Sequence, residues 1–149
     1  MNRQAIYETL KIDEGVKYEI YNDHLGYPTF GVGHLVLSSD AEHGKALGTR
    51  VSEERVQECF ERDLDTAIAE CETLYETRTF AEFPSEVQEV LVNMMFNMGR
   101  TRLGGFKNFR KALEEGDWAK AGIEGRDSRW YRQVTNRAER LMSRLEQVS

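Results

Sequence analysis

Residues 18–37 interrupt the helical pattern of the chain, and this interruption most constrains what the chain can fold into. Before it, apolar residues recur at helical spacing and predict a helix over 3–13, with Gly15 as a left-handed stop. Within it, alternating residues and Gly-rich turns predict a small antiparallel sheet. Pro28 lacks an N–H group and therefore favours a strand start or an edge position.

Helical periodicity returns after this segment. Ser52 is placed to cap a long helix that runs to residue 74. The stretch "PSEVQ" (84–88) predicts a capping box that opens a helix through Met98, ended by Gly99. This helix is apolar nearly all round, which predicts the buried centre of a helical lobe. Shorter helices are predicted over 107–115, after a cap at Asp117, near 128–131, and after a cap at Thr135.

The order of these elements predicts an α+β, mostly helical fold in one domain over 1–149 with two lobes. The predicted small sheet lobe covers about 14–55 and is followed by a connecting helix over about 52–74. The predicted helical lobe covers about 75–149 and includes the first helix. A cleft between such lobes is the default site for a ligand.

Composition and segment lengths exclude several classes of protein. Hydrophobic residues make up 40% of the 149 residues and charged residues 31%, as in a compact domain. The apolar run over 90–98 is too short to span a bilayer. The first four residues lack the apolar core of a secretory signal, so we expect synthesis in a cytoplasm without stable membrane association.

The two cysteines and three histidines do not resemble a metal site in their spacing, and no metal or cofactor is expected. On one helix Cys59 and Cys71 would lie roughly 18 Å apart, at 1.5 Å per residue. A disulfide requires less than about 7 Å between Cα atoms. The sequence therefore predicts reduced, core-facing thiols.

Charge is distributed unevenly along the chain, whose net charge is −6. Residues 51–90 carry twelve acids and three bases, a segment charge of −9. Residues 91–144 carry twelve bases and six acids, a segment charge of +6. The second segment can steer an anionic polymer toward the protein, or the asymmetry is only an uneven solvated surface.

Glu14 and Asp23 are the acids whose positions need an explanation. Glu14 follows Asp13 at the end of the first helix, where the macrodipole disfavours negative charge by about 0.3–1 kcal/mol. Glycoside hydrolysis needs one protonated acid and one ionised partner, and two acids in different surroundings supply this. The alternative is structural: Glu14 pairs with an arginine, and Asp23 supports its own turn.

Three blocks of sequence resemble the phage lysozymes, the endolysins of glycoside hydrolase family 24. The first is "IDEG…IYND…GYPTFGVGHL", which begins at Ile12. The second is "LVNMMFNMG" over 91–99, and the third is "SRWYRQVTNRAER" over 128–140. The three blocks occur in the order of the family and span most of the chain, which single short motifs do not.

This resemblance implies a lysozyme-like fold and roles for individual residues. Glu14 matches the general acid of the family, and Asp23 matches the carboxylate that positions the attacking water. Thr29 matches the hydroxyl beside that water. Arg137 matches the arginine that holds the acid, and its charge would explain why the helix tolerates Glu14 at its end. Enzymes of the family invert the configuration at the anomeric carbon.

Further positions follow from the same resemblance. His34 matches a histidine that pairs with an aspartate of the connecting helix, here Asp63. Leu35 and Phe96 match positions that line the saccharide cleft, although a phenylalanine such as Phe96 is more often a core residue.

The chain also departs from the family. The segment over 37–51 is short, which predicts a loop in place of part of the small lobe's helical structure. Two cleft positions are changed, to Phe109 and Glu124, and this leaves subsite preferences open.

The resemblance implies a monomeric muramidase that hydrolyses the β-1,4 bond between N-acetylmuramic acid and N-acetylglucosamine in peptidoglycan. Its partner is the glycan strand, not nucleic acid. It would be made in the cytoplasm of a bacterial host and reach the wall through a holin-type, membrane-permeabilising partner to cause lysis. Two alternatives are a lytic transglycosylase, against which Asp23 and Thr29 argue, and a non-catalytic binding module for wall glycan or, through the basic segment 126–140, for nucleic acid.

Overall fold

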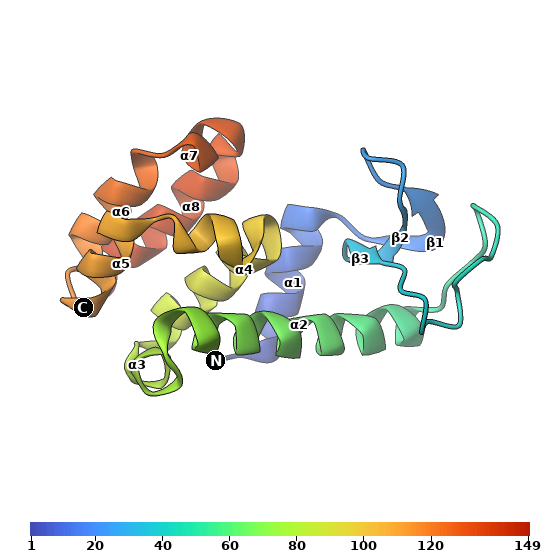
Figure 1. Cartoon of the computed structure of the whole chain (residues 1–149), viewed down its shortest axis with the longest axis horizontal. Coiled ribbons are helices and arrows are strands. Elements are labelled where there is room, and N and C mark those ends of the chain that lie inside the picture. Colours follow the sequence, from blue (N-terminus) through green and yellow to red (C-terminus); the bar gives the residue numbers. More distant parts are fainter. The chain divides into compact units, whose positions relative to one another are not determined.

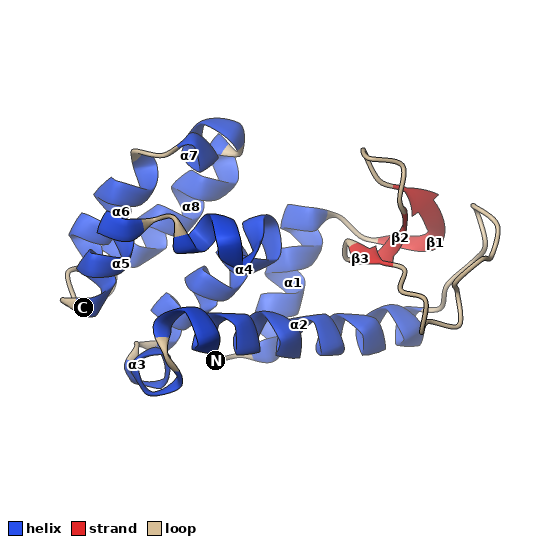
Figure 2. Cartoon of the chain, in the orientation of Figure 1, coloured by secondary structure: helices blue, strands red, loops and turns tan.

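The computed structural model describes all residues, 1–149, and consists of helices and one small sheet (Figures 1 and 2). This arrangement confirms the predicted α+β, mostly helical class. In chain order the elements are α1 (Arg3–Glu14), β1 (Lys17–Asn22), β2 (Pro28–Gly31), β3 (His34–Leu35), α2 (Glu53–Tyr75), α3 (Thr77–Glu82), α4 (Ser85–Gly104), α5 (Lys107–Glu114), α6 (Trp118–Arg126), α7 (Arg129–Gln133) and α8 (Thr135–Glu146).

Contacts between Cα atoms divide the chain into two compact units. The sheet unit comprises residues 2–66, and the helical unit comprises residues 67–149 with Met1. The sequence assigns the first helix to the helical lobe, whereas the contacts place α1 in the sheet unit. Aromatic packing in that unit explains the difference, because the rings of Tyr7 and Phe60 lie 4.6 Å apart.

The strands of the sheet unit are antiparallel and pair in the order β1-β2-β3 (Figure 2). Pro28 is the first residue of β2, which confirms one of its two predicted positions. Phe30 lies opposite His34 in the register of β2 and β3, and both side chains are buried. Ile20 of β1 is buried as well, so one face of the sheet belongs to the core of the unit.

The segment 36–52 forms turns and contains no helix, as its short length predicts. Its last residues return along β1. The Ile20 N–H donates to the Thr49 carbonyl at 2.9 Å, and the Val51 N–H donates to the Tyr18 carbonyl at 2.9 Å. These hydrogen bonds satisfy backbone groups of β1 that would otherwise form an open sheet edge.

Helix α2 starts as predicted, because the Ser52 hydroxyl accepts a hydrogen bond from the Arg55 N–H at 3.1 Å. Its buried stripe begins with Val56 and Phe60, each 1% exposed. The sheet approaches this stripe closely at Gly31, where an added Cβ would lie 3.1 Å from a methyl carbon of Val56. The backbone of Gly31 also has a positive φ of 65°, so this position needs glycine for two reasons.

Helix α4 forms the centre of the helical unit, and most of its side chains between Val87 and Met98 are buried, as predicted. Gly99 breaks the helical geometry with φ 80° and ψ 169°. The helix then resumes as far as Gly104, beyond the predicted end. Helix α6 packs against α5 and α8 in the same unit (Figure 1).

Two local predictions in the helical unit are wrong, and one short helix was missed. The capping box at α4 does not form: Pro84 is the N-cap without a side-chain hydrogen bond, and the Gln88 amide donates instead to the Phe80 carbonyl at 2.9 Å. Thr135 is the first residue of α8 and not its cap, because its hydroxyl donates to the Tyr131 carbonyl at 2.8 Å. The sequence did not predict helix α3, because a helix of six residues shows little hydrophobic periodicity.

Cys59 and Cys71 are free and buried, which confirms the predicted reduced thiols. Burial raises the pKa of the Cys71 thiol to about 12, so this group stays protonated at neutral pH. None of the helices combines the length and apolar character that a membrane crossing requires.

We expect Gly31→Ala to lower the free energy of unfolding by about 2–4 kcal/mol, because it adds a crowded Cβ to a left-handed backbone. Gly44→Ala is the matched control: its φ is 82°, and an added Cβ would meet no atom within 4 Å. The control should cost only about 1–2 kcal/mol. Urea unfolding of both variants checks this, and equal losses would show that the Val56 contact contributes nothing.

Candidate active site

Glu14 is the last residue of α1 and is half-buried. Gly15 follows with φ 77°, so the chain turns sharply away from the helix directly after the carboxylate. A Cβ added at Gly33 would lie 3.7 Å from Glu14 Oε1. The Glu14 carboxylate therefore lies against the tight turn between β2 and β3, where the lack of a side chain gives it space.

Asp23 lies in the turn between β1 and β2. Its Oδ1 accepts hydrogen bonds from the Leu25 N–H at 2.9 Å and the Tyr27 N–H at 2.8 Å. This is the turn-supporting arrangement of the structural alternative. Both bonds use the same oxygen, so the turn fixes the carboxylate and leaves Oδ2 for another partner.

Thr29 lies next to this turn, in β2, and is 3% exposed. Its hydroxyl donates to the Tyr27 carbonyl at 3.0 Å. The same carbonyl accepts the Asp23 N–H at 2.9 Å. The main chain of Tyr27 therefore holds both Asp23 and Thr29, and the lone pairs of the Thr29 hydroxyl stay available to accept a hydrogen bond.

The strand register gives Thr29 its neighbours. Tyr21 of β1 and Leu35 of β3 lie directly opposite Thr29 on either side. Directly opposed residues share a face of an antiparallel sheet, so these three form one row on the face opposite Phe30. Burial raises the pKa of the Tyr21 phenol, and the charges of Asp23 and Glu14 raise it further. The charges of both carboxylates thus affect the same side chain of this row, that of Tyr21.

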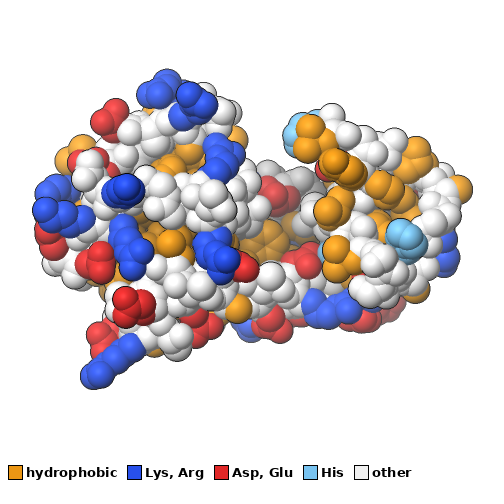
Figure 3. All heavy atoms as spheres, in the orientation of Figure 1, with side chains coloured by type: hydrophobic (Ala, Val, Ile, Leu, Met, Phe, Trp, Pro, Cys, Tyr) orange, Lys and Arg blue, Asp and Glu red, His pale blue; other side chains and the backbone are white.

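Leu35, a predicted substrate-binding residue, is 47% exposed. Figure 3 shows hydrophobic side chains gathered on the surface of the sheet unit. The large apolar side chains exposed around the turn and β3 are Leu25, Tyr27, Leu35 and Leu37. Exposed apolar groups beside fixed polar groups are typical of a binding surface.

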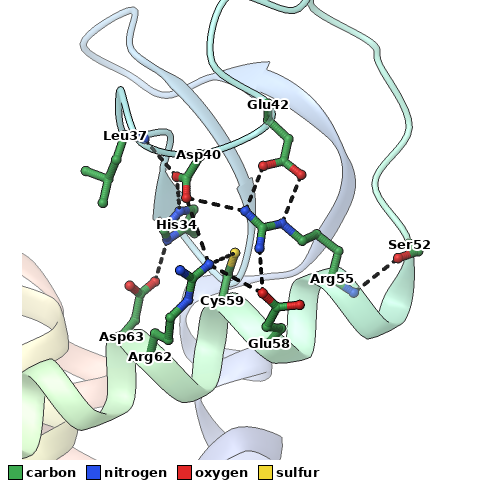
Figure 4. A network of polar contacts seen from close by, with 10 residues as sticks. All are labelled: His34, Leu37, Asp40, Glu42, Ser52, Arg55, Glu58, Cys59, Arg62 and Asp63. Carbon is green, nitrogen blue, oxygen red and sulfur yellow. Dashed lines mark hydrogen bonds and ion pairs between the residues drawn. The ribbon is translucent and has the colours of Figure 1, made fainter.

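His34 and Asp63 form the predicted pair, with 2.7 Å between His34 Nδ1 and Asp63 Oδ2 (Figure 4). The sequence did not reveal a second partner, Asp40, whose Oδ2 lies 2.8 Å from His34 Nε2. Burial would lower the pKa of His34, but the hydrogen bonds to Asp63 and Asp40 raise it above the ordinary value. In its imidazolium form His34 donates to both carboxylates and so joins β3 to α2 and to the loop between them.

Phe96 and Arg137 belong to the helical unit. Phe96 is half-buried on α4. Arg137 of α8 is buried and donates from Nε to Asn93 Oδ1 at 2.9 Å and from an Nη to the Asn93 carbonyl at 3.2 Å. Sequence reasoning missed Asn93, which is 3% exposed and orients this guanidinium. The expected role of Arg137 toward Glu14 stays a prediction.

The two changed cleft positions meet in one pocket of the helical unit. The pocket has a volume of about 260 Å³, and Phe109 and Glu124 both line it. Phe109 is 1% exposed and Glu124 is half-buried. Trp130 is buried and donates to Asn97 Oδ1 at 2.7 Å, which indicates a packing role.

Two carboxylates and a hydroxyl at the edge of a small sheet, followed by a helical bundle, are typical of a glycoside hydrolase of the lysozyme type. The profile of the family described as phage lysozyme matches residues 11–147. The chain therefore belongs to the phage lysozyme family, whose members are glycoside hydrolases.

Individual relatives agree with this assignment. A probable T4-type lysozyme 2 from Dictyostelium discoideum is 31% identical over 159 aligned positions, covering 95% of this chain and 94% of the relative. The pre-baseplate central spike protein Gp5 of Enterobacteria phage T4 is 31% identical over 90% of this chain, which spans 26% of that protein. The peptidoglycan hydrolase gp36 of Pseudomonas phage phiKMV is 30% identical over 89% of this chain, which spans 14% of it.

Replacement of Asp63 by Asn should lower the free energy of unfolding by about 1–3 kcal/mol, because it removes a charged hydrogen-bond acceptor from the His34 imidazolium. Asp65→Asn is the control, since Asp65 is 69% exposed and pairs with Arg3 at the surface. Surface pairs contribute about 0–1 kcal/mol. Thermal and urea unfolding of both variants separate the two cases; similar losses would contradict a stabilising role of the His34–Asp63 pair.

Proposed function

We propose that this protein is a lysozyme that hydrolyses the β-1,4 bond between N-acetylmuramic acid and N-acetylglucosamine in bacterial peptidoglycan. The observation that carries the proposal is the common support of Asp23 and Thr29 by the main chain of Tyr27. Membership of the phage lysozyme family supports the same reaction, and one relative is named a peptidoglycan hydrolase.

In this proposal Glu14 is the general acid. It donates its proton to the glycosidic oxygen as the bond to the anomeric carbon breaks, so that the leaving sugar departs as an alcohol. Its place beside Gly33, where backbone rather than a side chain borders the carboxylate, leaves room for a bulky sugar oxygen to approach.

Asp23 and Thr29 hold the attacking water. Water can donate one hydrogen to Asp23 Oδ2 and the other to the Thr29 oxygen, whose own hydrogen is directed to the Tyr27 carbonyl. A lone pair of the water is then free to attack the anomeric carbon. Asp23 takes the proton as the new bond forms, and the product carries the inverted configuration. Inverting enzymes keep their two carboxyls about 6.5–9.5 Å apart to leave room for this water.

Host lysis is part of the same proposal. The protein would act as a monomer after a holin-type partner opens the membrane to give it access to the wall. The basic segment 91–144, with its charge of +6, suits an anionic wall polymer. A lytic transglycosylase would need no captured water, and the support of Asp23 and Thr29 favours hydrolysis over that reaction.

We expect Glu14→Gln to reduce the lysis of purified walls at least 10²–10⁴-fold, the usual contribution of a general acid. Glu8→Gln is the control, because Glu8 is an exposed residue of the same helix that pairs with Lys11. Reducing-sugar release from purified peptidoglycan is the measurement, with circular dichroism to verify folding. Normal activity in the folded Glu14→Gln protein would refute the assignment.

The products test the proposed fate of the water. Hydrolysis with inversion should first release the α-anomer at the new reducing end, observed by proton NMR before mutarotation. Thr29→Val should slow this release, whereas Thr29→Ser should retain most of it because the hydroxyl is kept. A β-anomer would overturn inversion, and an anhydro-sugar end found by mass spectrometry would identify a transglycosylase instead.

A further inference from the structure

Three side chains that are far apart in the sequence meet behind the sheet, away from the proposed reaction. His34 lies in β3, Asp40 lies in the following loop, and Cys59 lies in α2 (Figure 4). Each is less than a tenth exposed, and one potential ligand atom from each lies within 4.8 Å of the others. Ligands of a tetrahedral zinc ion lie roughly 3.3–3.8 Å apart, so shifts of about 1 Å would suffice.

The groups around these three side chains already have the orientation that a metal site needs. His34 donates from Nδ1 to Asp63, which turns Nε2 toward Asp40. Metal-binding histidines almost always give their other ring N–H to a carboxylate or carbonyl in this way. The Leu37 N–H donates to Asp40 Oδ2 at 2.8 Å, so the second ligand is held in place as well.

The charge of the cluster also allows a divalent cation. Four carboxylates face three cations here, a net charge of −1 when His34 is protonated and Cys59 is a thiol. A divalent cation that displaces one proton from His34 Nε2 and one from Cys59 Sγ leaves this net charge unchanged. The carboxylates are Asp40, Glu42, Glu58 and Asp63, and the cations are His34, Arg55 and Arg62.

Two guanidinium groups border the cluster and must be accommodated. The contacts of Arg62 are long, at 3.7 Å from Cys59 Sγ and 3.9 Å from Asp40. Because 58% of its side chain is exposed, Arg62 can turn outward. Arg55 is fixed by two hydrogen bonds of 2.9 Å to Glu42. Its contact with Asp40, at 3.3 Å, is longer and goes to Oδ1, the oxygen that does not contact His34.

We propose that His34 Nε2, Asp40 and Cys59 Sγ form a binding site for a zinc-class divalent cation. One imidazole, one carboxylate and one thiolate are ligands typical of Zn²⁺ and of its substitute Co²⁺. A water molecule would occupy the fourth position, on the side from which Arg62 turns away. The ion would hold β3, the loop over 36–52 and α2 together, independently of the proposed hydrolysis.

Cobalt titration of the full-length protein under reducing conditions tests this site. One equivalent of Co²⁺ should produce the charge-transfer absorption of a thiolate–cobalt bond, and Zn²⁺ should abolish it by displacement. Cys59→Ser should lose the band. Cys71→Ser is the matched control and should keep it, because Cys71 is a buried cysteine of the same helix outside the cluster.

A second measurement covers the case in which Cys59→Ser does not fold. Zn²⁺ should protect Cys59 of the unmodified protein from alkylation during partial unfolding, as read from its peptide by mass spectrometry, and Asp40→Asn should weaken this protection. The absence of a cobalt band in the parent protein, or its persistence in folded Cys59→Ser, would overturn the proposal.

Discussion

The main chain of Tyr27 forms the hydrogen bonds on which the proposed chemistry depends. Its N–H fixes one oxygen of Asp23, and its carbonyl accepts both the Asp23 N–H and the Thr29 hydroxyl. Pro28 follows directly and restricts Tyr27 to extended conformations. A turn that would otherwise be a flexible hairpin loop therefore positions two side chains without a large supporting core.

The sequence predicts well those features that depend on neighbours along the chain. The long helix after Ser52, its cap and the strand start at Pro28 follow from local periodicity and turn chemistry, and the structure confirms them. The loop predicted over 37–51 follows instead from the short length of that segment, and residues 36–52 contain no helix. Local signals fail where competing partners are distant. The capping box predicted over 84–88 does not form, because the Gln88 amide donates to the Phe80 carbonyl of α3. The local sequence pattern does not reveal this partner.

The same distinction separates the predicted from the missed site residues. Glu14, Asp23 and Thr29 could be proposed as site residues because their motifs are contiguous in the sequence. Asn93 could not, since its role depends on a contact with Arg137, 44 residues further along the chain. Asp40 is hidden for a similar reason: it is one of 26 acidic residues, and only the folded loop brings it to His34.

The carboxylates of Asp40 and Asp23 differ in how many of their oxygens already accept hydrogen bonds. Asp40 uses both oxygens, with His34 and the Leu37 N–H on one and Arg55 on the other. A neutral molecule such as water disturbs this carboxylate at a high cost, because it would replace bonds that already stabilise the charge. Asp23 has both of its hydrogen bonds on one oxygen. A water molecule that binds at the other oxygen replaces only solvent, so the turn can support the fold and still take part in a reaction.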